Sequence, residues 1–231
     1  MKIGFVYDVP YPWHVGGIES MNFNEAQELA KGNEVHYFTT KWPGMKENEF
    51  KKDKIQYHAY GETDQEHIYQ NGRRSVLEAF FFKFSLSNMF NHKLDVVVTN
   101  QFPILHLPIV KLYCLVTNTK LVMEVAEVWD MKYWRAYLGS TTGSLAYNYQ
   151  RLWIGGADAY VTISSKTTAE LQKEGIPKDK IREFAPAIDD KLLSRIKKGK
   201  AKRTKTIIFS GRLIKEKRVD KWIDAFALLY S

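Results

Sequence analysis

Short apolar runs alternate with longer amphipathic segments along most of this chain. The runs predict strands over residues 2–7, 34–40, 54–60, 95–100, 121–128 and 159–164. Apolar positions at helical spacing predict helices after residue 17 and over residues 73–92, 104–116, 144–154 and 166–174. The last three strands are apolar on both faces, as a sheet covered by helices on both sides requires. The pattern therefore predicts an α/β fold with a Rossmann-like, doubly wound and mainly parallel sheet.

The last 35 residues follow a different pattern. Residues 197–205 are rich in lysine and form a basic linker, and residues 206–209 predict a buried strand that a Gly-Arg turn joins to an amphipathic helix. We expect a Rossmann-like domain over residues 1–196, the linker over 197–205, and the first strand and helix of a second domain over 206–231. The remainder of that second domain is expected to be absent. Without a neighbouring strand, residues 206–209 are expected to be mobile, to fold back on the first domain, or to pair with a second copy in a dimer of the truncated chain.

The charge is concentrated at this junction. The chain carries 34 basic and 26 acidic residues, a net charge of +8. Residues 191–221 hold 13 Lys or Arg against 2 acidic residues, so the rest of the chain is mildly acidic. Such a cluster is typical of a solvated linker, and also of a surface that binds nucleic acid or an anionic membrane.

Composition excludes several classes. A single cysteine, Cys114, excludes a disulfide framework and favours the reducing cytosol. No apolar run reaches 18 residues, so no segment is expected to span a membrane. The six histidines lack any ligand spacing such as H-E-x-x-H, so neither a metal site nor a cofactor is expected.

The first loop contains paired glycines just before a helix. Gly16 and Gly17 let backbone amides approach a ligand closely, and the positive end of the helix suits a phosphate. Glu19 lies in the first turn, and His14 is a candidate acid, base or ligand contact. The alternative is a plain tight turn.

Acids and aromatic residues follow the predicted strand 121–128. Glu127, Trp129 and Asp130 lie at the carboxyl edge, where open α/β sheets bind their ligands. Carboxylates accept hydrogen bonds from hydroxyl groups and aromatic rings stack on sugars, so these residues suit a polyhydroxylated ligand. An ordinary aromatic-rich helix packed on the sheet is the alternative.

The predicted helix 73–92 is rich in phenylalanine. One helical stripe favours core positions and leaves Phe82 and Phe90 outside the core; the stripe contains Leu77, Phe80, Phe81, Phe84 and Met89. The bulky apolar surface and its basic neighbours also suit a membrane interface.

Two cations stand out near the end of the chain. Arg212 follows Gly211 at the end of the predicted strand 206–209, and Lys217 lies at the predicted first turn of the next helix. A bidentate guanidinium, an ammonium group and helix-end amides together suit a diphosphate, whereas isolated surface cations are the alternative.

Three segments carry a resemblance to a known family. The motif P-W-H-V-G-G-I-E-S with its helix, residues 156–189, and residues 211–217 with the following V-D-K-W-I-D-A-F-A-L-L resemble family 4 retaining glycosyltransferases of GT-B fold. The similarity extends over nearly the whole chain. It implies an N-terminal acceptor domain, a C-terminal nucleotide-sugar domain and chemistry in the cleft between them, without a metal.

The resemblance also implies roles for individual residues. Gly16 and Gly17 would flank the donor diphosphate, and Arg212 and Lys217 would hold it and stabilise the leaving-group charge. Candidate catalytic residues are Glu127 and His14. Candidate acceptor contacts are Glu19, Asn100, Trp129 and Asp130.

The chain departs from the family pattern at three places. Ala126 and Asn100 stand where relatives often have histidine, and the paired-glutamate motif of the donor domain is missing. We therefore expect this polypeptide to be an inactive portion of a cytoplasmic or membrane-peripheral enzyme. That enzyme would transfer a sugar from a nucleotide-diphosphate sugar to a carbohydrate or lipid-linked hydroxyl acceptor. The alternative is a non-catalytic α/β module that binds nucleic acid or anionic membrane.

Overall fold

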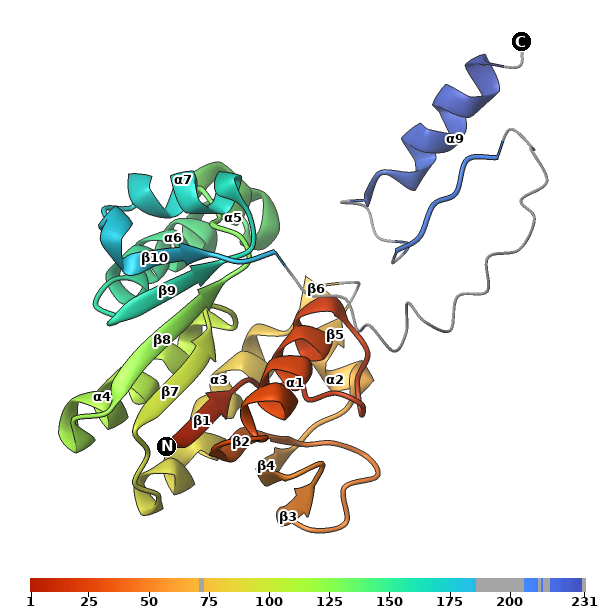
Figure 1. Cartoon of the computed structure of the whole chain (residues 1–231). Coiled ribbons are helices and arrows are strands. Elements are labelled where there is room, and N and C mark those ends of the chain that lie inside the picture. Colours follow the sequence, from red (N-terminus) through yellow and green to blue (C-terminus); the bar gives the residue numbers. More distant parts are fainter. Residues whose placement is uncertain (71–72, 186–205, 212, 214–216, 230–231) are drawn as a thin grey trace. The chain divides into compact units, whose positions relative to one another are not determined.

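The computed structural model describes residues 1–70, 73–185, 206–211, 213 and 217–229 (Figure 1). The chain divides into two compact units. The first contains residues 1–70 and 74–187, and the second contains residues 71–73 and 188–231. Each unit is described by itself below.

The first unit is built on an eight-stranded sheet with the order β10-β9-β8-β7-β1-β2-β4-β3. Every neighbouring pair is parallel except β3 with β4, which is antiparallel. The predicted α/β fold with a mainly parallel, doubly wound sheet is confirmed. The strands are β1 (Lys2–Val6), β2 (Glu34–Lys41), β3 (Glu49–Lys52), β4 (Ile55–Glu62), β7 (Val96–Asn100), β8 (Lys120–Val125), β9 (Ala159–Thr162) and β10 (Ile181–Glu183).

Strand β3 was not predicted. It lies in the polar insert between the expected strands 34–40 and 54–60, and it pairs Phe50 with Tyr57 of β4. As an edge strand it buries little: its four residues are exposed or half-buried. Charged edge strands carry no alternating apolar signal, which explains why the insert resembled a loop. A second sheet joins β5 (Tyr69–Gln70) to β6 (Arg73–Arg74).

Helices cover both faces of the large sheet, as Figure 1 shows. One apolar cluster packs residues of α1 such as Phe23 and Ala26 on β1, β2 and β4. The other packs Phe82 of α3 and Val110 of α4 on the opposite face. The helices of this unit are α1 (Gly17–Leu29), α2 (Gln65–Ile68), α3 (Val76–Ser85), α4 (Leu107–Thr117), α5 (Met131–Leu138), α6 (Ser140–Ile154) and α7 (Ser165–Lys173). Short 3-10 turns are η1 (Leu86–Asn91), η2 (Ile104–His106) and η3 (Lys178–Lys180).

The phenylalanine-rich helix differs from its prediction in length and in orientation. It begins only at Val76, because the Ser75 hydroxyl caps it by accepting from the Glu78 amide, and it gives way to η1 at Leu86. Phe82, expected outside the core, is buried with 1% of its surface exposed. The expected core positions are exposed, apart from the buried Met89: Leu77, Phe80, Phe81 and Phe84.

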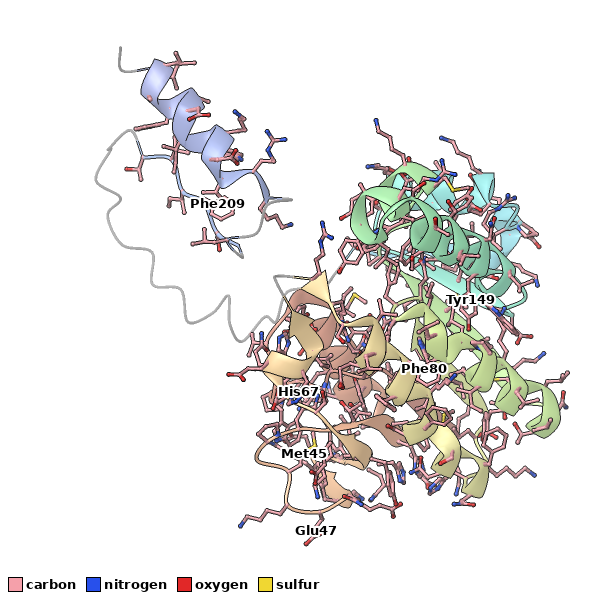
Figure 2. All side chains as sticks on the ribbon, turned by 180° about the vertical axis from the view of Figure 1, so that it is seen from behind. Met45, Glu47, His67, Phe80, Tyr149 and Phe209 are labelled. Carbon is pink, nitrogen blue, oxygen red and sulfur yellow. The ribbon has the colours of Figure 1, made fainter. Side chains whose placement is uncertain are left out.

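This error has a physical cause. With several large apolar residues in ten positions, two different stripes satisfy helical spacing, and the sheet selects the one that contains Ala79, Phe82 and Leu86. Burial of one such phenylalanine stabilises the fold by about 2–3 kcal/mol. The exposed rings therefore form an apolar surface on α3, where Figure 2 labels Phe80.

In the second unit the regular element among the described residues is α9 (Val219–Leu228). Residues 206–210, predicted as a strand, have no regular secondary structure. A strand is stabilised by hydrogen bonds to a neighbour, and the described part of this unit supplies none. The linker predicted over 197–205 lies outside the described residues.

Candidate functional site

The carboxyl edge of the sheet contains the point at which the strand order reverses. After β1 the chain moves to β2 on one side, whereas β7, on the other side of β1, leads to β8. The strand order therefore reverses between β1 and β7, and sheets of this class bind ligands beyond the carboxyl ends of the strands at such a point. The loop after β1 carries His14, Gly16 and Gly17, and the loop after β8 carries Glu127 and Trp129.

The glycine loop places a histidine beside a buried carboxylate. Glu19 of α1 is buried, and its carboxylate lies 3.5 Å from Nδ1 of His14. The His14 ring packs between Trp42 and Tyr69, with ring centroids 5.4 and 5.7 Å away. A Cβ at Gly16 would collide with the Glu19 carboxylate, so glycine is needed there for this close approach.

Gly17 differs from its neighbour. It is exposed, and a Cβ built on it would meet no atom within 4 Å. The fold therefore does not require a glycine at this position, the first residue of α1. A ligand that approaches the backbone amides at the start of this helix would require one.

A buried ion pair beside this loop was missed by the sequence analysis. The Asp8 carboxylate, just after β1, pairs with the guanidinium of Arg74, which also donates to the Tyr7 hydroxyl over 3.4 Å. Burial raises the pKa of Tyr7 well above its usual range, so this phenol stays protonated. The other carboxylate oxygen of Asp8 is buried and has no hydrogen-bond partner among the described residues. Asp8 and Arg74 are 66 positions apart in the sequence, so no local pattern indicates this pair.

Asn100 belongs to a buried polar network. Its amide donates to the carboxylate of Glu124 on β8 over 2.9 Å, and its oxygen lies 2.6 Å from the Asn22 amide of α1. Burial raises the pKa of Glu124 well above its usual range, and a hydrogen bond with Glu25 raises it further. Both effects favour the protonated form of Glu124. The sequence analysis missed Glu124 because it sits in an otherwise apolar strand.

Trp129 is the centre of an aromatic cluster. The rings of Phe102, Tyr133, Trp134 and Tyr137 lie with centroids 4.5–5.0 Å from that of Trp129. The indole nitrogen of Trp129 is buried, and no acceptor lies within hydrogen-bond distance of it among the described residues. This cluster combines aromatic faces with a buried donor that has no protein partner among the described residues, and aromatic faces of this kind stack on sugar rings.

One buried amide fixes this cluster. Gln150 of α6 donates to the backbone oxygen of Trp129 over 2.9 Å and accepts from the indole of Trp134 over 3.0 Å. Gln101 donates to the same Gln150 oxygen over 3.1 Å, which ties the ends of β7 and α6 together. Position 143 must be glycine, because a Cβ there would collide with the backbone of Trp134. The site is therefore held by neutral hydrogen bonds and close packing.

The two predicted acids near Trp129 differ in their roles. Asp130 accepts a hydrogen bond from the Tyr133 amide over 2.7 Å and so caps α5. Glu127 is exposed in the loop, because β8 ends at Val125, earlier than predicted. Glu127 and Asp130 are both exposed, and Asp130 is the one engaged in a helix cap.

The predicted diphosphate cations belong to the second unit. Lys217 is exposed and lies two residues before α9, not in its first turn as predicted. Arg212 lies outside the described residues. The structure thus brings His14, Gly16, Gly17 and Glu19 together at the start of α1.

Similar folds occur in solved structures of sugar-transferring enzymes. Sucrose-phosphate synthase from Thermosynechococcus elongatus aligns with a TM-score of 0.63 and 13% identity, over 83% of this chain and 49% of that one. Trehalose-6-phosphate synthase from E. coli, bound with UDP-2-fluoro glucose, aligns with a TM-score of 0.55 and 11% identity, over 84% and 50%. This chain spans about half the length of both. The fold is that of GT-B glycosyltransferases.

The sequence itself gives the family. Residues 15–192 match the family Glycosyltransferase Family 4. The chain belongs to this family, which confirms the resemblance noted from its motifs. No curated protein sequence matches the chain. In the part of the chain that the structure describes, every helix is too short or too polar to cross a lipid bilayer.

Proposed function

We propose that this chain forms the acceptor-binding part of a retaining glycosyltransferase. The enzyme transfers a sugar from a nucleotide-diphosphate sugar to a hydroxyl group of a carbohydrate or lipid-linked acceptor. The observation that carries this proposal is the family 4 match together with Gly17, an exposed glycine at the start of α1 where the fold itself would tolerate a side chain.

The acceptor is proposed to bind between the glycine loop and the aromatic cluster. Trp129 offers a ring face and an unpaired indole N–H, and the exposed Glu127 offers a carboxylate that can orient or deprotonate a hydroxyl group. His14, held by Glu19, is the second candidate for this proton transfer. Asn100 and Asp130 contribute through the groups that they position, since Asn100 holds Glu124 and Asp130 caps α5.

The donor diphosphate is proposed to lie against Gly16 and Gly17, with Arg212 and Lys217 opposite. Two cations and the start of α1 would stabilise the negative charge that develops on the leaving diphosphate, so the transfer itself needs no metal or other cofactor. Retention then follows from attack of the acceptor on the face that the diphosphate leaves. Without further donor-site residues the 231-residue polypeptide is proposed to be inactive alone.

A matched pair of glycines tests the donor site. A Cβ at Gly17 or at Gly32 meets no atom within 4 Å, and both residues are exposed. Gly17→Val should therefore lower kcat/KM for the nucleotide sugar by about 10-fold or more in the longest polypeptide that the reading frame encodes, because the side chain occupies the diphosphate position. Gly32→Val should leave kcat/KM unchanged. Equal activity of the two variants would remove Gly17 from the site.

A matched pair of glutamate variants tests the acceptor site. Glu127→Gln should lower kcat by about 100-fold, the usual scale for loss of a general base. Glu28→Gln, which removes an exposed carboxylate near the end of α1, should leave kcat unchanged. The measurement is the acceptor-dependent release of nucleoside diphosphate. If Glu127→Gln retained full kcat while His14→Gln lost it, the base would be reassigned to His14.

The exposed surface of α3 supports contact with a membrane. Phe80, Phe81 and Phe84 are exposed, and the ammonium group of Lys83 lies 3.7 Å from the Phe80 ring centroid. Apolar rings beside a lysine suit the boundary between acyl chains and anionic headgroups. We therefore favour a lipid-linked acceptor reached by a peripherally bound enzyme.

Flotation with phosphatidylglycerol vesicles measures this contact. Phe81→Glu should reduce the vesicle-bound fraction at least several-fold, because it places a negative charge among the exposed rings. Leu29→Glu is the control, since Leu29 is exposed on α1, which packs on the other face of the sheet. Equal binding of both variants would remove α3 from the membrane contact.

A further inference from the structure

Three histidines from distant parts of the sequence meet in the amino half of the sheet. His36 lies on β2, His58 on β4 and His92 directly after η1. One ring nitrogen from each lies within 4.8 Å of the other two. His36 and His58 are buried and His92 is half-buried. These residues belong to no part of the proposed sugar-transfer site, which lies at the carboxyl edge.

The two buried rings face each other edge to edge. Nδ1 of His36 lies 2.9 Å from Nε2 of His58, and the rings are nearly coplanar, with an interplanar angle of 9°. The third ring approaches from the side: the His92 centroid lies 4.3 Å from that of His58 and 5.4 Å from that of His36.

The outer nitrogen of each of these two rings contacts a carboxylate. Nε2 of His36 lies 3.0 Å from the Glu34 carboxylate, and Nδ1 of His58 lies 3.4 Å from the Glu49 carboxylate. A carboxylate accepts hydrogen bonds only, so each outer nitrogen carries the proton of its neutral ring. Each inner nitrogen then presents a lone pair to the other.

In these tautomers the two inner nitrogens bring lone pairs within 2.9 Å of each other, and a cation bound to both would stabilise the arrangement. A carboxylate behind each imidazole is also the arrangement that fixes the tautomer and raises the basicity of a metal-binding histidine. The Tyr60 hydroxyl orients the Glu49 carboxylate by donating a hydrogen bond to it over 2.8 Å.

We propose that His36, His58 and His92 form a zinc-binding site. Imidazole nitrogens are ligands that zinc prefers, and Zn–N distances of about 2.0–2.1 Å place the ligand nitrogens of a tetrahedral site about 3.4 Å apart. That spacing lies between the 2.9 Å of the close pair and the 4.8 Å limit of the trio. Modest movements of side chains therefore complete the geometry.

The position of the third ligand is fixed by the backbone. The His92 carbonyl accepts from the Tyr113 hydroxyl of α4 over 2.7 Å, and the His92 amide donates to Met89 over 3.0 Å. Three protein ligands leave a fourth position for water, on the half-buried side of His92. The bound ion would join β2, β4 and the connection from η1 to β7, and thereby stabilise that part of the sheet.

The test is metal binding by the 231-residue chain after removal of metals with a chelator. Titration with Zn²⁺ should give one bound ion per chain and a rise in the thermal unfolding midpoint. Co²⁺ should give the visible absorption bands of a tetrahedral site. Neither readout depends on sugar transfer. Absence of stoichiometric binding would overturn the proposal. A proton shared between His36 and His58 would then account for their short contact.

Variants assign the ligands. His92→Asn changes the least buried of the three and should abolish the Co²⁺ bands and the Zn²⁺-dependent midpoint shift, while circular dichroism confirms the fold. His67→Asn, which changes an exposed histidine beside Asp64 on α2, should bind Zn²⁺ as the unmodified chain does. Glu49→Gln should weaken binding by about 10–100-fold through loss of the outer hydrogen bond. Equal binding by His92→Asn and His67→Asn would contradict the site.

Discussion

The two halves of the sheet bury polar groups in different ways. At the carboxyl edge the Asp8 carboxylate faces Arg74, and Glu124 is hydrogen-bonded to Asn100. In the amino half two imidazole nitrogens lie 2.9 Å apart with a third histidine beside them. The first arrangement is stabilised by protein groups alone, whereas the second is proposed to bind a cation. The comparison teaches that the partners of a buried group, more than its burial, indicate whether it holds the fold or awaits a ligand.

Removal of Arg74 should have the largest effect on stability. Arg74→Ala leaves the buried carboxylate of Asp8 without its cation, which costs about 3–5 kcal/mol of unfolding free energy. Urea unfolding followed by fluorescence measures this loss. The double variant Asp8→Asn/Arg74→Ala should recover most of it, because no charge is then left unpaired. A double variant as unstable as Arg74→Ala would show that Arg74 acts through packing on Tyr7 and Tyr69.

A pH dependence of somewhat smaller size is expected from His106. Burial lowers the pKa of this ring to about 4, and its Nε2 lies 2.8 Å from the Thr99 hydroxyl. Between pH 6.5 and 4 the unfolded chain takes up a proton at this residue that the folded chain excludes. The unfolding free energy therefore falls with falling pH, by about 3 kcal/mol in total.

Comparison with His106→Gln isolates this contribution. The variant lacks the ionisable ring, so its unfolding free energy should fall less than that of the unmodified chain over the same interval. The measurement is urea unfolding at several pH values between 7 and 4. Parallel curves for the two proteins would show that His106 is not the responsible group, and would direct attention to His58, whose pKa is also lowered to about 4.

Glu124→Gln should have the smallest effect, and of opposite sign. The raised pKa of Glu124 means that the folded chain holds a proton which the unfolded chain releases above its own, lower pKa. The contribution of Glu124 to the unfolding free energy is therefore fully present below that lower pKa. It declines as the pH rises towards the pKa of Glu124 in the folded chain. Glutamine is uncharged and removes this decline, so the variant should equal or slightly exceed the unmodified chain at pH 8. A loss above 1 kcal/mol at pH 8 would show that the carboxylate is ionised in the fold.

Much of the fold could be predicted from the sequence because parallel strands buried on both faces carry an unmistakable apolar signal. The strand over residues 95–100 was recognised in this way. The helix after Gly17 was recognised from apolar residues at helical spacing. The stripe of α3 was not, since two stripes fit the same ten residues and packing on the sheet selects the one with Phe82. The charged edge strand β3 gave no signal at all.

The same contrast applies to the candidate site: residues close together in the sequence could be predicted, and contacts between distant elements could not. The glycine loop and Trp129 were found because their residues are close together in the sequence. Arg74 and Glu124 were missed because their partners come from other elements, and so was the meeting of His36 with His58, 22 residues later. Only the pairing of strands brings such groups together.

The most direct test of the sugar-transfer account is the anomeric configuration of the product. The longest polypeptide that the reading frame encodes would be assayed with nucleotide-diphosphate sugars and lipid-linked acceptors, and the first product followed by proton NMR. The account predicts transfer with the configuration of the donor, reduced at least 10-fold by Gly17→Val, and no turnover by residues 1–231 alone. An inverted product, or full activity of the Gly17→Val variant, would contradict it.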